Sequence, residues 1–538
     1  MPNQDTQVTK SYAEAIYRRS TQSVRPPGFD VNWADQPLRY KVMEAVTPLP
    51  LPMLRSTATT SYAEVLTRLR RKAFSSQSLT EEQFAQVNHL AYGLLTRRLN
   101  LDWNGENKPG HPFYHSLYSR GTPSGGGMYP TEMYWVEGAN SQFVPGVYHY
   151  QSAHHSLDRL YAGNLLPHLS GLVNEPSLAS SSRLLVLSLR FWKNSFKYHN
   201  FSYHVITMDV GALLASLRLL AASMGVDLPI IYWYPDTQVD KLLGLNTVDE
   251  SSFAIMPIPS SQTGVLATTP PSLDTPLFTK PVYERSKTLL KFDLAADVHQ
   301  SALVQDEPRP LLTAAVGYAE WQPVTPSKPL PPIDSTMFNI DTASVFYQRR
   351  SSFGRFSSER PITTAQLGQV LYATTALQGY RSDLSPDGTN TYLTRLVVYC
   401  NNVAGLNRGV YVYDATNHGL STVIEADYTT YWQPNYFLHN YNLNETAVIV
   451  GIIAKTEAVI DLLGNRGLRV LHAEVGMMTQ GLYLATAALG LGCGAVLGFN
   501  NININQLFSL GDSKERTLIL VMIGGERRNP GHFISEIK

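Results

Sequence analysis

Cysteine is almost absent from the 538-residue chain, which contains only Cys400 and Cys493. This scarcity excludes a disulfide framework and a cysteine-rich zinc site, and it is typical of a reducing cytoplasm. Neither sign of charge is in excess, with 43 Lys and Arg against 43 Asp and Glu. Nucleic acids and anionic membranes are therefore not expected as partners.

Long apolar runs are also missing. No uninterrupted apolar stretch reaches about 18 residues, so we expect no membrane-spanning helix. Residues 1–18 are polar and lack the apolar core of a secretory signal, so we expect a cytoplasmic protein. Hydrophobic residues as a class are nevertheless plentiful, at 43% of the chain. They are enough for two domains of about 200 to 250 residues each.

An internal repeat divides the chain. The segment GVYHY at 146–150 has a near copy, GVYVY, at 409–413. A Pro-turn element precedes each copy by 23 residues, and a Gly-to-Gly segment begins 65 or 67 residues after it. Four landmarks in one order at nearly equal spacing indicate a duplicated fold. The paired landmarks are Pro123 and Pro386, Gly146 and Gly409, Gly211 and Gly476, and Gly225 and Gly490.

Two Pro-rich stretches mark the join between the copies, one at 270–276 and one at 309–332. Proline does not fit helix interiors or central strands, so we expect these stretches to run extended over the surface. The chain then divides into an N-terminal extension, a first repeat unit, a Pro-rich linker and a second repeat unit. Their expected bounds are 1–55, 56–275, 276–335 and 336–538. An insertion at 100–115 occurs only in the first unit.

Each unit alternates strand and helix patterns. The apolar runs 184–190 and 447–454 predict buried strands. The Gly-to-Gly segments, rich in Ala, Leu and Met, predict helices packed on the sheets. Segments 80–93 and 363–379 each begin with a Thr in N-cap position and end at Gly, which predicts one helix in each. The expected fold class is α+β, used twice.

These motifs resemble those of the nitroreductase-like FMN flavoproteins, and most closely their SagB-type dehydrogenase branch, which includes thiazoline and oxazoline oxidases. SRGTPSGGGMYPTEMYWV at 119–136 resembles the branch's turn-and-strand element. YQRRSSFGRFSSERPIT at 347–363 resembles the family's opening R-R-S motif before its first helix, and the segments at 490–499 and 521–528 resemble its closing motifs. The resemblance implies two tandem α+β sandwich domains that form an intramolecular pseudo-dimer. One chain then supplies both halves, so the protein can be a monomer.

The resemblance further implies one complete FMN site between the units, because family members join the R-R-S motif of one subunit to the P-S turn of the other. Two guanidiniums and a hydroxyl can bind a phosphate dianion. A glycine run lets backbone N–H groups approach a flat ring. The closing motifs add two residues. Arg527 is expected as a further phosphate contact. Gly492 is expected at the cofactor, or alternatively serves a helix cap and close packing. The residues expected to bind FMN are Arg349, Arg350, Ser351, Pro123, Ser124, Gly125, Gly126, Gly492 and Arg527.

The converse site is expected to be lost. It would join RLRRKAF at 68–74 with SPDGTNTY at 385–392. Its R-R-S motif is broken, and Asp387 replaces the turn serine. A carboxylate there would repel electron density on a reduced flavin. We therefore predict one FMN per chain, and no metal.

A Lys-Tyr pair is associated with catalysis in the azoline-oxidising branch, and Lys197-Tyr198 falls where that branch carries it. The matching place in the second unit reads Leu462-Leu463. A partly desolvated lysine has a lowered pKa and can act as a general base, with the tyrosine orienting it or binding the substrate. Alternatively, Lys197 is a surface lysine in a loop and Tyr198 packs on the sheet. The sequence leaves open whether Lys197 faces the same flavin as Ser124.

The resemblance implies a dehydrogenase that oxidises a thiazoline or oxazoline to the azole in a peptide or carrier-protein-bound natural-product precursor, with FMN reoxidised by oxygen. Companion biosynthetic enzymes are candidate partners, docking at the N-terminal extension or at the insertion around Trp103. One alternative is a general NAD(P)H-dependent nitro or quinone reductase, which would not need Lys197. The other is a non-catalytic flavin-binding scaffold.

Overall fold

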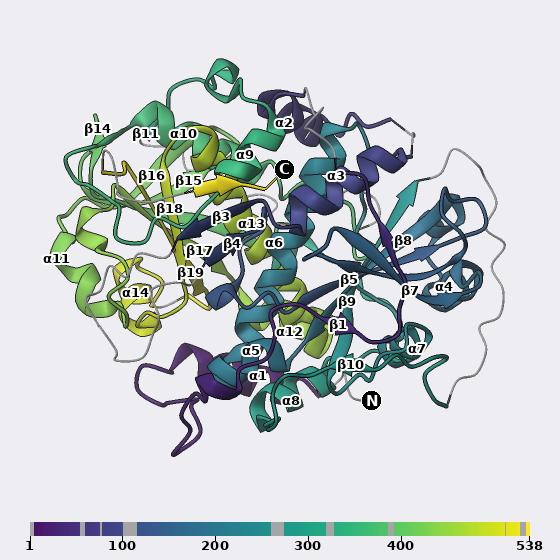
Figure 1. Ribbon diagram of the computed structural model, residues 1–538. Coiled ribbons are helices and arrows are strands. Elements are labelled where there is room, and N and C mark those ends of the chain that lie inside the picture. Colours follow the sequence, from purple (N-terminus) through teal and green to yellow (C-terminus); the bar gives the residue numbers. More distant parts are fainter. Residues whose placement is uncertain are drawn as a thin grey trace.

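A computed structural model shows two β-sheets, one from each repeat unit, on either side of two long central helices (Figure 1). The structure describes residues 5–53, 60–75, 78–99, 116–259, 274–318, 328–385, 392–511, 513–527 and 534–537. The insertion at 100–115, with Trp103, and the turn residues Pro386, Asp387 and Gly388 lie outside these ranges.

The first unit folds around a six-stranded sheet in the order β2-β7-β6-β5-β8-β9. Its paired strands run antiparallel. The strand expected at 184–190 lies within β8, so that prediction is confirmed. The strands are β2 (Pro48–Pro50), β5 (Thr131–Glu137), β6 (Gly146–Gln151), β7 (Ser156–Ala162), β8 (Ser181–Arg190) and β9 (Glu250–Pro259).

The second unit has a seven-stranded sheet in the order β11-β16-β15-β13-β17-β19-β18. Five neighbouring strands, β16-β15-β13-β17-β19, repeat the order of β7-β6-β5-β8-β9 in the first sheet. This shared order confirms the α+β fold expected twice. The strands are β11 (Lys328–Pro329), β13 (Thr394–Cys400), β15 (Gly409–Asp414), β16 (Gly419–Ile424), β17 (Val448–Ala454), β18 (Gly492–Val496) and β19 (Arg516–Gly524).

Both predicted Thr-capped helices are present. In α3 (Glu81–Tyr92) and α10 (Thr364–Thr375) the preceding Thr forms a capping box with the Gln three residues later. The first helix ends at Gly93 as expected, whereas the second ends at Ala376, before it reaches Gly379. The remaining helices of eight or more residues outside the core are α1 (Gln7–Tyr17), α2 (Tyr62–Arg71), α4 (Leu166–Val173), α8 (Asp293–Ser301) and α12 (Thr456–Leu463).

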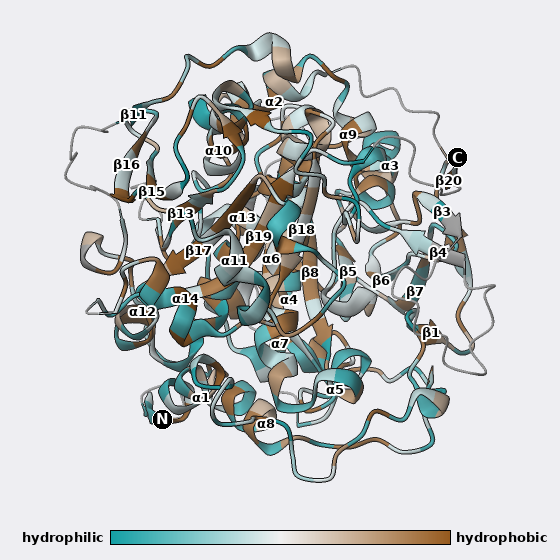
Figure 2. Cartoon of the chain, turned by 90° about the vertical axis from the view of Figure 1, so that its left-hand side faces the viewer, coloured by the Kyte–Doolittle hydropathy of each residue, from teal (hydrophilic) through white to brown (hydrophobic). Residues whose placement is uncertain are grey.

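The two core helices, α6 (Ser202–Ser223) and α13 (Gly467–Ala488), cross at the repeated glycines. A Cβ at Gly211 would overlap the carbonyl oxygen of Ala473, and a Cβ at Gly476 would overlap that of Met208. The repeat therefore keeps glycine at both positions because the two backbones touch there. Hydrophobic residues, brown in Figure 2, concentrate on this helix pair and on the strands beside it.

One helical stretch, Trp192–Ser223, is apolar and long enough by composition to cross a membrane, although polar residues interrupt it before any apolar run reaches about 18 residues. All of its apolar window is buried inside the protein. Its hydrophobicity is explained by its place between the two sheets, where it packs on α13.

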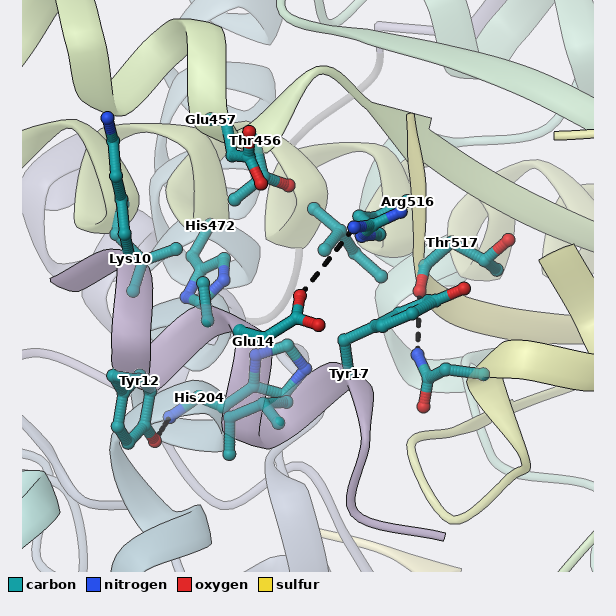
Figure 3. A pocket seen from close by; sticks show the side chains of 15 residues that line it. Lys10, Tyr12, Glu14, Tyr17, His204, Thr456, Glu457, His472, Arg516 and Thr517 are labelled. Atoms are coloured by element: carbon teal, nitrogen blue, oxygen red, sulfur yellow. Dashed lines mark hydrogen bonds and ion pairs between the residues drawn. The ribbon is translucent and has the colours of Figure 1, made fainter. Parts of the chain in front are cut away.

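The N-terminal extension covers one end of this helix crossing (Figure 3). Tyr12 of α1 accepts a hydrogen bond from the backbone N–H of His204 at 3.0 Å, and Glu14 faces Arg516 of the second unit at 3.6 Å. Next to them the rings of His204 and His472 meet edge to face, with 4.7 Å between their centroids. The cavity at this junction measures about 30 Å³, room for about one or two waters and not for a cofactor.

The linker and the C-terminus tie the units together. Between its two Pro-rich stretches, the linker forms β10 (Val282–Tyr283), which pairs with β1 (Val42–Met43), and helix α8. Near the C-terminus, β20 (Ile534–Glu536) pairs with β3 (Thr96–Leu99), and β3 pairs in turn with β4 (Ser116–Ser119) of the first unit. The second unit thus extends over the first, close to the start of the P-S turn.

Candidate functional site

A cavity of about 490 Å³ lies between the two repeat units. The first unit lines it with the turn after β4, with α5 (Trp192–Tyr198) and with α6. The second unit lines it with the segment after α9 (Thr342–Gln348), with α13 and with β18. The structure brings together here nine of the residues singled out in the sequence: Pro123, Ser124, Gly125, Gly126, Lys197, Tyr198, Arg349, Arg350 and Ser351.

The P-S turn is fixed by a half-buried carboxylate, Asp209. Ser124 Oγ donates to Asp209 Oδ2 at 2.6 Å, and Gly125 N donates to Asp209 Oδ1 at 2.9 Å. Ser124 Oγ also accepts from the backbone N–H of Tyr129 at 2.9 Å. Gly126 has a φ of 66°, in the left-handed region that glycine adopts without cost. Asp209 of α6 therefore holds the turn against the floor of the cavity.

The Lys-Tyr pair lies directly over this turn. A Cβ at Gly126 would stand 2.5 Å from Tyr198 Oη and 3.1 Å from Lys197 Nζ. Both side chains line the same cavity as Ser124. The sequence left open whether Lys197 and Ser124 share a site. Burial, with Arg39 nearby, lowers the pKa of Lys197, while burial raises the pKa of Tyr198 to about 12. The tyrosine stays protonated at neutral pH, and the lysine is shifted toward the range of a general base.

Helix α5 is anchored by a buried ion pair. Lys193 Nζ lies 2.6 Å from Glu132 Oε1 of β5, with only 4% and 6% of the two side chains exposed. Glu132 also bonds His149 Nε2 at 2.9 Å. Breaking such a pair would leave an uncompensated buried charge. Lys197 is therefore half-buried on a firmly held helix, in contrast to the alternative of a surface lysine in a loop.

The R-R-S motif follows a helix. The resemblance led us to expect it ahead of the unit's first helix, but α9 ends at Gln348 and Arg349 is its C-cap. The expectation was wrong in this detail, because the short segment 342–348 carries its own Asp341 cap and was not recognised as helical. Cations are favoured at a helix C-terminus by the helix dipole. Ser351 Oγ lies 3.0 Å from Tyr483 Oη of α13.

Both arginines of the motif keep unused hydrogen-bonding capacity. Arg349 Nη2 donates to the carbonyl oxygen of Arg120, in the first unit, at 2.9 Å. Arg350 forms an ion pair with Glu526. In the described part of the chain, the Nε atoms of Arg349 and Arg350 are buried without a hydrogen-bond partner. Buried donors of this kind call for a ligand or an ordered water.

Gly492 and Arg527 do not line the cavity. Gly492 lies in β18, where a Cβ would come within 2.9 Å of Ser352 Oγ. The backbone N–H of Arg527 donates to the carbonyl oxygen of Arg355 at 2.8 Å. These contacts favour the alternative interpretation of Gly492, close packing.

Two charged residues that line the cavity, Arg39 and Asp209, were missed in the sequence. Arg39 comes from the N-terminal extension, which has no counterpart in the second unit to draw attention to it. Asp209 belongs to a signal that was visible: Asp-Val-Gly at 209–211 and Glu-Val-Gly at 474–476 stand at the same place in the two Gly-to-Gly segments. The rim is apolar in part, with Leu438 54% and Phe353 38% exposed.

At the converse interface the arginines are occupied by the protein itself. Arg68 of α2 donates to the carbonyl oxygen of Ser223 at 2.9 Å and pairs with Glu64 at 2.5 Å. Arg70 donates to the carbonyl oxygen of Tyr372 and lies over its ring, 3.7 Å from the centroid. Both guanidiniums thus serve packing between elements of the fold.

The converse interface has no counterpart of the Lys-Tyr pair in the sequence. Leu462 and Leu463, at the end of α12, stand where the first unit has its Lys-Tyr pair. Asp387 lies outside the described residues, so its predicted effect remains a prediction. Among the residues that the structure describes, no group of three or more His, Cys, Asp or Glu is arranged to hold a metal ion.

Sequence comparison finds the same domain twice. The profile of the nitroreductase family matches residues 67–258 and again residues 347–525. A nitroreductase-like protein of Methanocaldococcus jannaschii is 28% identical over 186 residues, which are 34% of this chain and 91% of the relative. The trifolitoxin-processing protein TfxB of Rhizobium leguminosarum bv. trifolii is 30% identical over 143 residues, which are 25% of this chain and 38% of TfxB.

A solved structure shares the complete fold. A nitroreductase-like protein of Anabaena variabilis ATCC 29413 matches 97% of this chain and 99% of its own, with a TM-score of 0.73 and 19% identity. At this identity the likeness concerns the fold, and it extends over both repeat units.

Proposed function

The chain belongs to the nitroreductase family, whose profile matches both repeat units, and from this premise we propose that it binds one FMN between them and dehydrogenates a five-membered ring. The proposed substrate is a thiazoline or oxazoline in a peptide or carrier-bound precursor, and the product is the aromatic azole. In this proposal the two units act as an intramolecular pseudo-dimer with a single working site.

The residues around the cavity fit FMN. A volume of about 490 Å³ is in the range of cofactor pockets. The backbone of the glycine run Gly125, Gly126 and Gly127 lines the cavity, where it can approach a flat ring closely. Arg349 and Arg350, each with an orphaned Nε, and the Ser351 hydroxyl are the donors that a phosphate dianion needs.

Bound FMN would supply the hydride acceptor. Lys197, in its neutral form, would take the acidic proton from the ring carbon, and the second hydrogen would leave that ring with its electron pair. The ring thereby gains a double bond and becomes aromatic. Tyr198, protonated because of its raised pKa, would donate a hydrogen bond to Lys197 or to the ring heteroatom.

The observation that carries this proposal is the placement of Lys197 and Tyr198 directly over Gly126. A reductase that only passes electrons from NAD(P)H to a nitro group or quinone has no need for a general base at this place. The likeness to a trifolitoxin-processing protein favours a precursor of the natural-product type.

The test begins with the purified protein. It should absorb at about 370 and 450 nm, as an oxidised flavin does. The FMN released on denaturation should amount to one per chain. A synthetic peptide carrying a thiazoline should then lose two hydrogens in air. Two FMN per chain would contradict the single site. Bleaching of the flavin by NADPH under nitrogen, without azole formation, would identify a reductase instead. The absence of any flavin after FMN is added would remove the enzyme proposal.

A further inference from the structure

The two core helices carry an acidic residue at the same position. Asp209 stands two residues before the crossing glycine Gly211 in α6, and Glu474 stands two residues before Gly476 in α13. Glu474 is buried and Asp209 is half-buried at the cavity wall, and burial raises the pKa of each to about 7. The duplication therefore offers a matched pair of groups that differ in what surrounds them.

Their surroundings differ in access to the cavity. Glu474 Oε1 accepts from the backbone N–H groups of Leu393 and Thr394 at 2.8 and 2.9 Å and does not line the cavity. Asp209 lines the cavity and is bonded to Ser124 and Gly125 of the P-S turn. Only the acid of the first unit is thus placed to respond to a ligand between the units.

The hydrogen bonds of Asp209 can be kept in either protonation state. As a carboxylate it accepts from Ser124 Oγ and from Gly125 N. As an acid it would donate to Ser124 Oγ, which has lone pairs available, and would still accept from Gly125 N. A proton can therefore enter or leave without unmaking the turn.

Among the residues that the structure describes, no cation forms an ion pair with Asp209. Burial raises the pKa of Asp209, and hydrogen bonds from the neutral donors Ser124 and Gly125 lower it in part. Isolated buried carboxylates are costly to ionise, so added negative charge nearby favours protonation. The titratable groups that face it or share its cavity are Tyr92, Arg39, Tyr118, Tyr129, Lys197, Tyr198, Arg349, Arg350, Tyr436 and Tyr483.

We propose that Asp209 is the charge-compensating positioning residue of the site: it holds the P-S turn as a carboxylate and takes up a proton when the ligand in the cavity gains negative charge. The inference rests on the proposed function, because that ligand is FMN. A hydride brings the flavin two electrons and one proton, which leaves one extra negative charge. A proton from solvent, entering at the rim, then neutralises Asp209.

The first test uses the unmodified holoprotein. FMN is photoreduced without oxygen in weak buffer, and proton uptake per flavin is followed with an indicator dye from about pH 6 to 9. Near neutral pH we expect about one proton more than at the alkaline end. Near neutral pH Asp209 is ionised beside oxidised FMN and protonated beside reduced FMN, whereas at alkaline pH it stays ionised beside both. Uptake that does not change over this range would overturn the inference, while flavin binding and reduction would leave the proposed function intact.

The second test assigns the proton. Asn at position 209 reproduces the bonds of the protonated acid, so Asp209→Asn should retain FMN and the turn. Its FMN should have a higher midpoint potential than the wild type at alkaline pH, with a gap that closes as the pH falls. Glu474→Gln, the matched change in the other unit, should leave the potential unchanged.

A gap that is absent or independent of pH in Asp209→Asn would contradict the inference. If that variant loses FMN, Asp209→Glu decides, because it keeps a titratable group and should retain the additional proton at a shifted pH. Loss of the additional proton in Asp209→Glu, with FMN retained, would likewise overturn it. The absence of FMN from the wild type would instead count against the proposed function.

Discussion

The two interfaces between the repeat units use equivalent positions of one fold in different ways. At the cavity, Arg349 and Arg350 follow a helix and keep buried Nε donors that no described group accepts from. At the converse interface, Arg68 and Arg70 bind main-chain carbonyls, a carboxylate and a tyrosine ring. Arg70 also has a buried Nε without a partner, so the two sides differ in what their arginines face: Arg349 and Arg350 line the cavity, and Arg68 and Arg70 do not.

The helix crossing shows the opposite behaviour, because there the two units remain alike. Gly211 and Gly476 each lie against the backbone of the opposite helix, and any side chain would overlap a carbonyl oxygen. Because both units need this close packing, both have a glycine at the crossing. The comparison separates positions that maintain the fold from positions that serve one interface, and each variant below tests that separation.

The largest effect is expected for Lys197→Ala. Removal of the proposed general base should lower the turnover of a thiazoline peptide by about 10²- to 10⁴-fold, with FMN content unchanged. Leu462→Ala, at the matching position of the second unit, should leave turnover as it was. Equal losses in the two variants would mean that both interfaces take part in the reaction.

The next effect concerns cofactor affinity. Arg350→Ala removes a charge-assisted hydrogen-bond donor worth about 1.5–3 kcal/mol, so the Kd for FMN should rise about 10- to 150-fold. It also leaves Glu526 without its ion-pair partner, which adds to the repulsion of a phosphate. Arg70→Ala is the matched control at the converse interface. Equilibrium titration of the apoprotein with FMN measures both, and a larger loss in Arg70→Ala would reverse the assignment of the working site.

A smaller effect distinguishes two neighbouring glycines. Gly126 and Gly127 have φ values of 66° and 67°, so Ala costs about 1–2 kcal/mol of backbone strain at either position. Only at Gly126 would the new Cβ also reach Tyr198, whereas nothing lies within 4 Å of one at Gly127. Turnover should therefore fall about tenfold further in Gly126→Ala than in Gly127→Ala. Equal turnover would show that the Lys-Tyr pair is not held over the turn.

The repeat and its landmarks could be predicted from the sequence because strands, capped helices and turn glycines obey local rules. The capping boxes at Thr80 and Thr363 are examples. The meeting of the P-S turn with the R-R-S motif was also foreseen, but only through the resemblance. Local patterns contain no information on which distant segments share a cavity.

What could not be predicted depends on long-range contacts. Arg39 reaches the cavity because the N-terminal extension lies across the helix crossing. Gly492 reads as part of a glycine-rich cofactor motif in the sequence, but its neighbours Ser352 and Phe356 show that it packs between segments of its own unit. Asp209 was visible as half of a repeated Asp/Glu-Val-Gly pattern, yet its bonds to the turn follow only from the fold.

The smallest expected effect tests the matched acids through stability. Burial raises the folded-state pKa of Glu474 from 4.5 to about 7, so the folded protein holds a proton that the unfolded chain releases at lower pH. The stability due to that proton is present below about pH 4.5 and is lost as the pH rises to 7. Glu474→Gln keeps the acceptor oxygen for Leu393 and Thr394 but needs no proton. The variant should therefore be more stable than the wild type by about 1–3 kcal/mol at pH 8, and equally stable near pH 4.5. Urea unfolding at the two pH values measures this difference. A variant that is less stable at pH 8 would mean that the folded protein needs Glu474 as a carboxylate, and burial would then not be what determines its protonation.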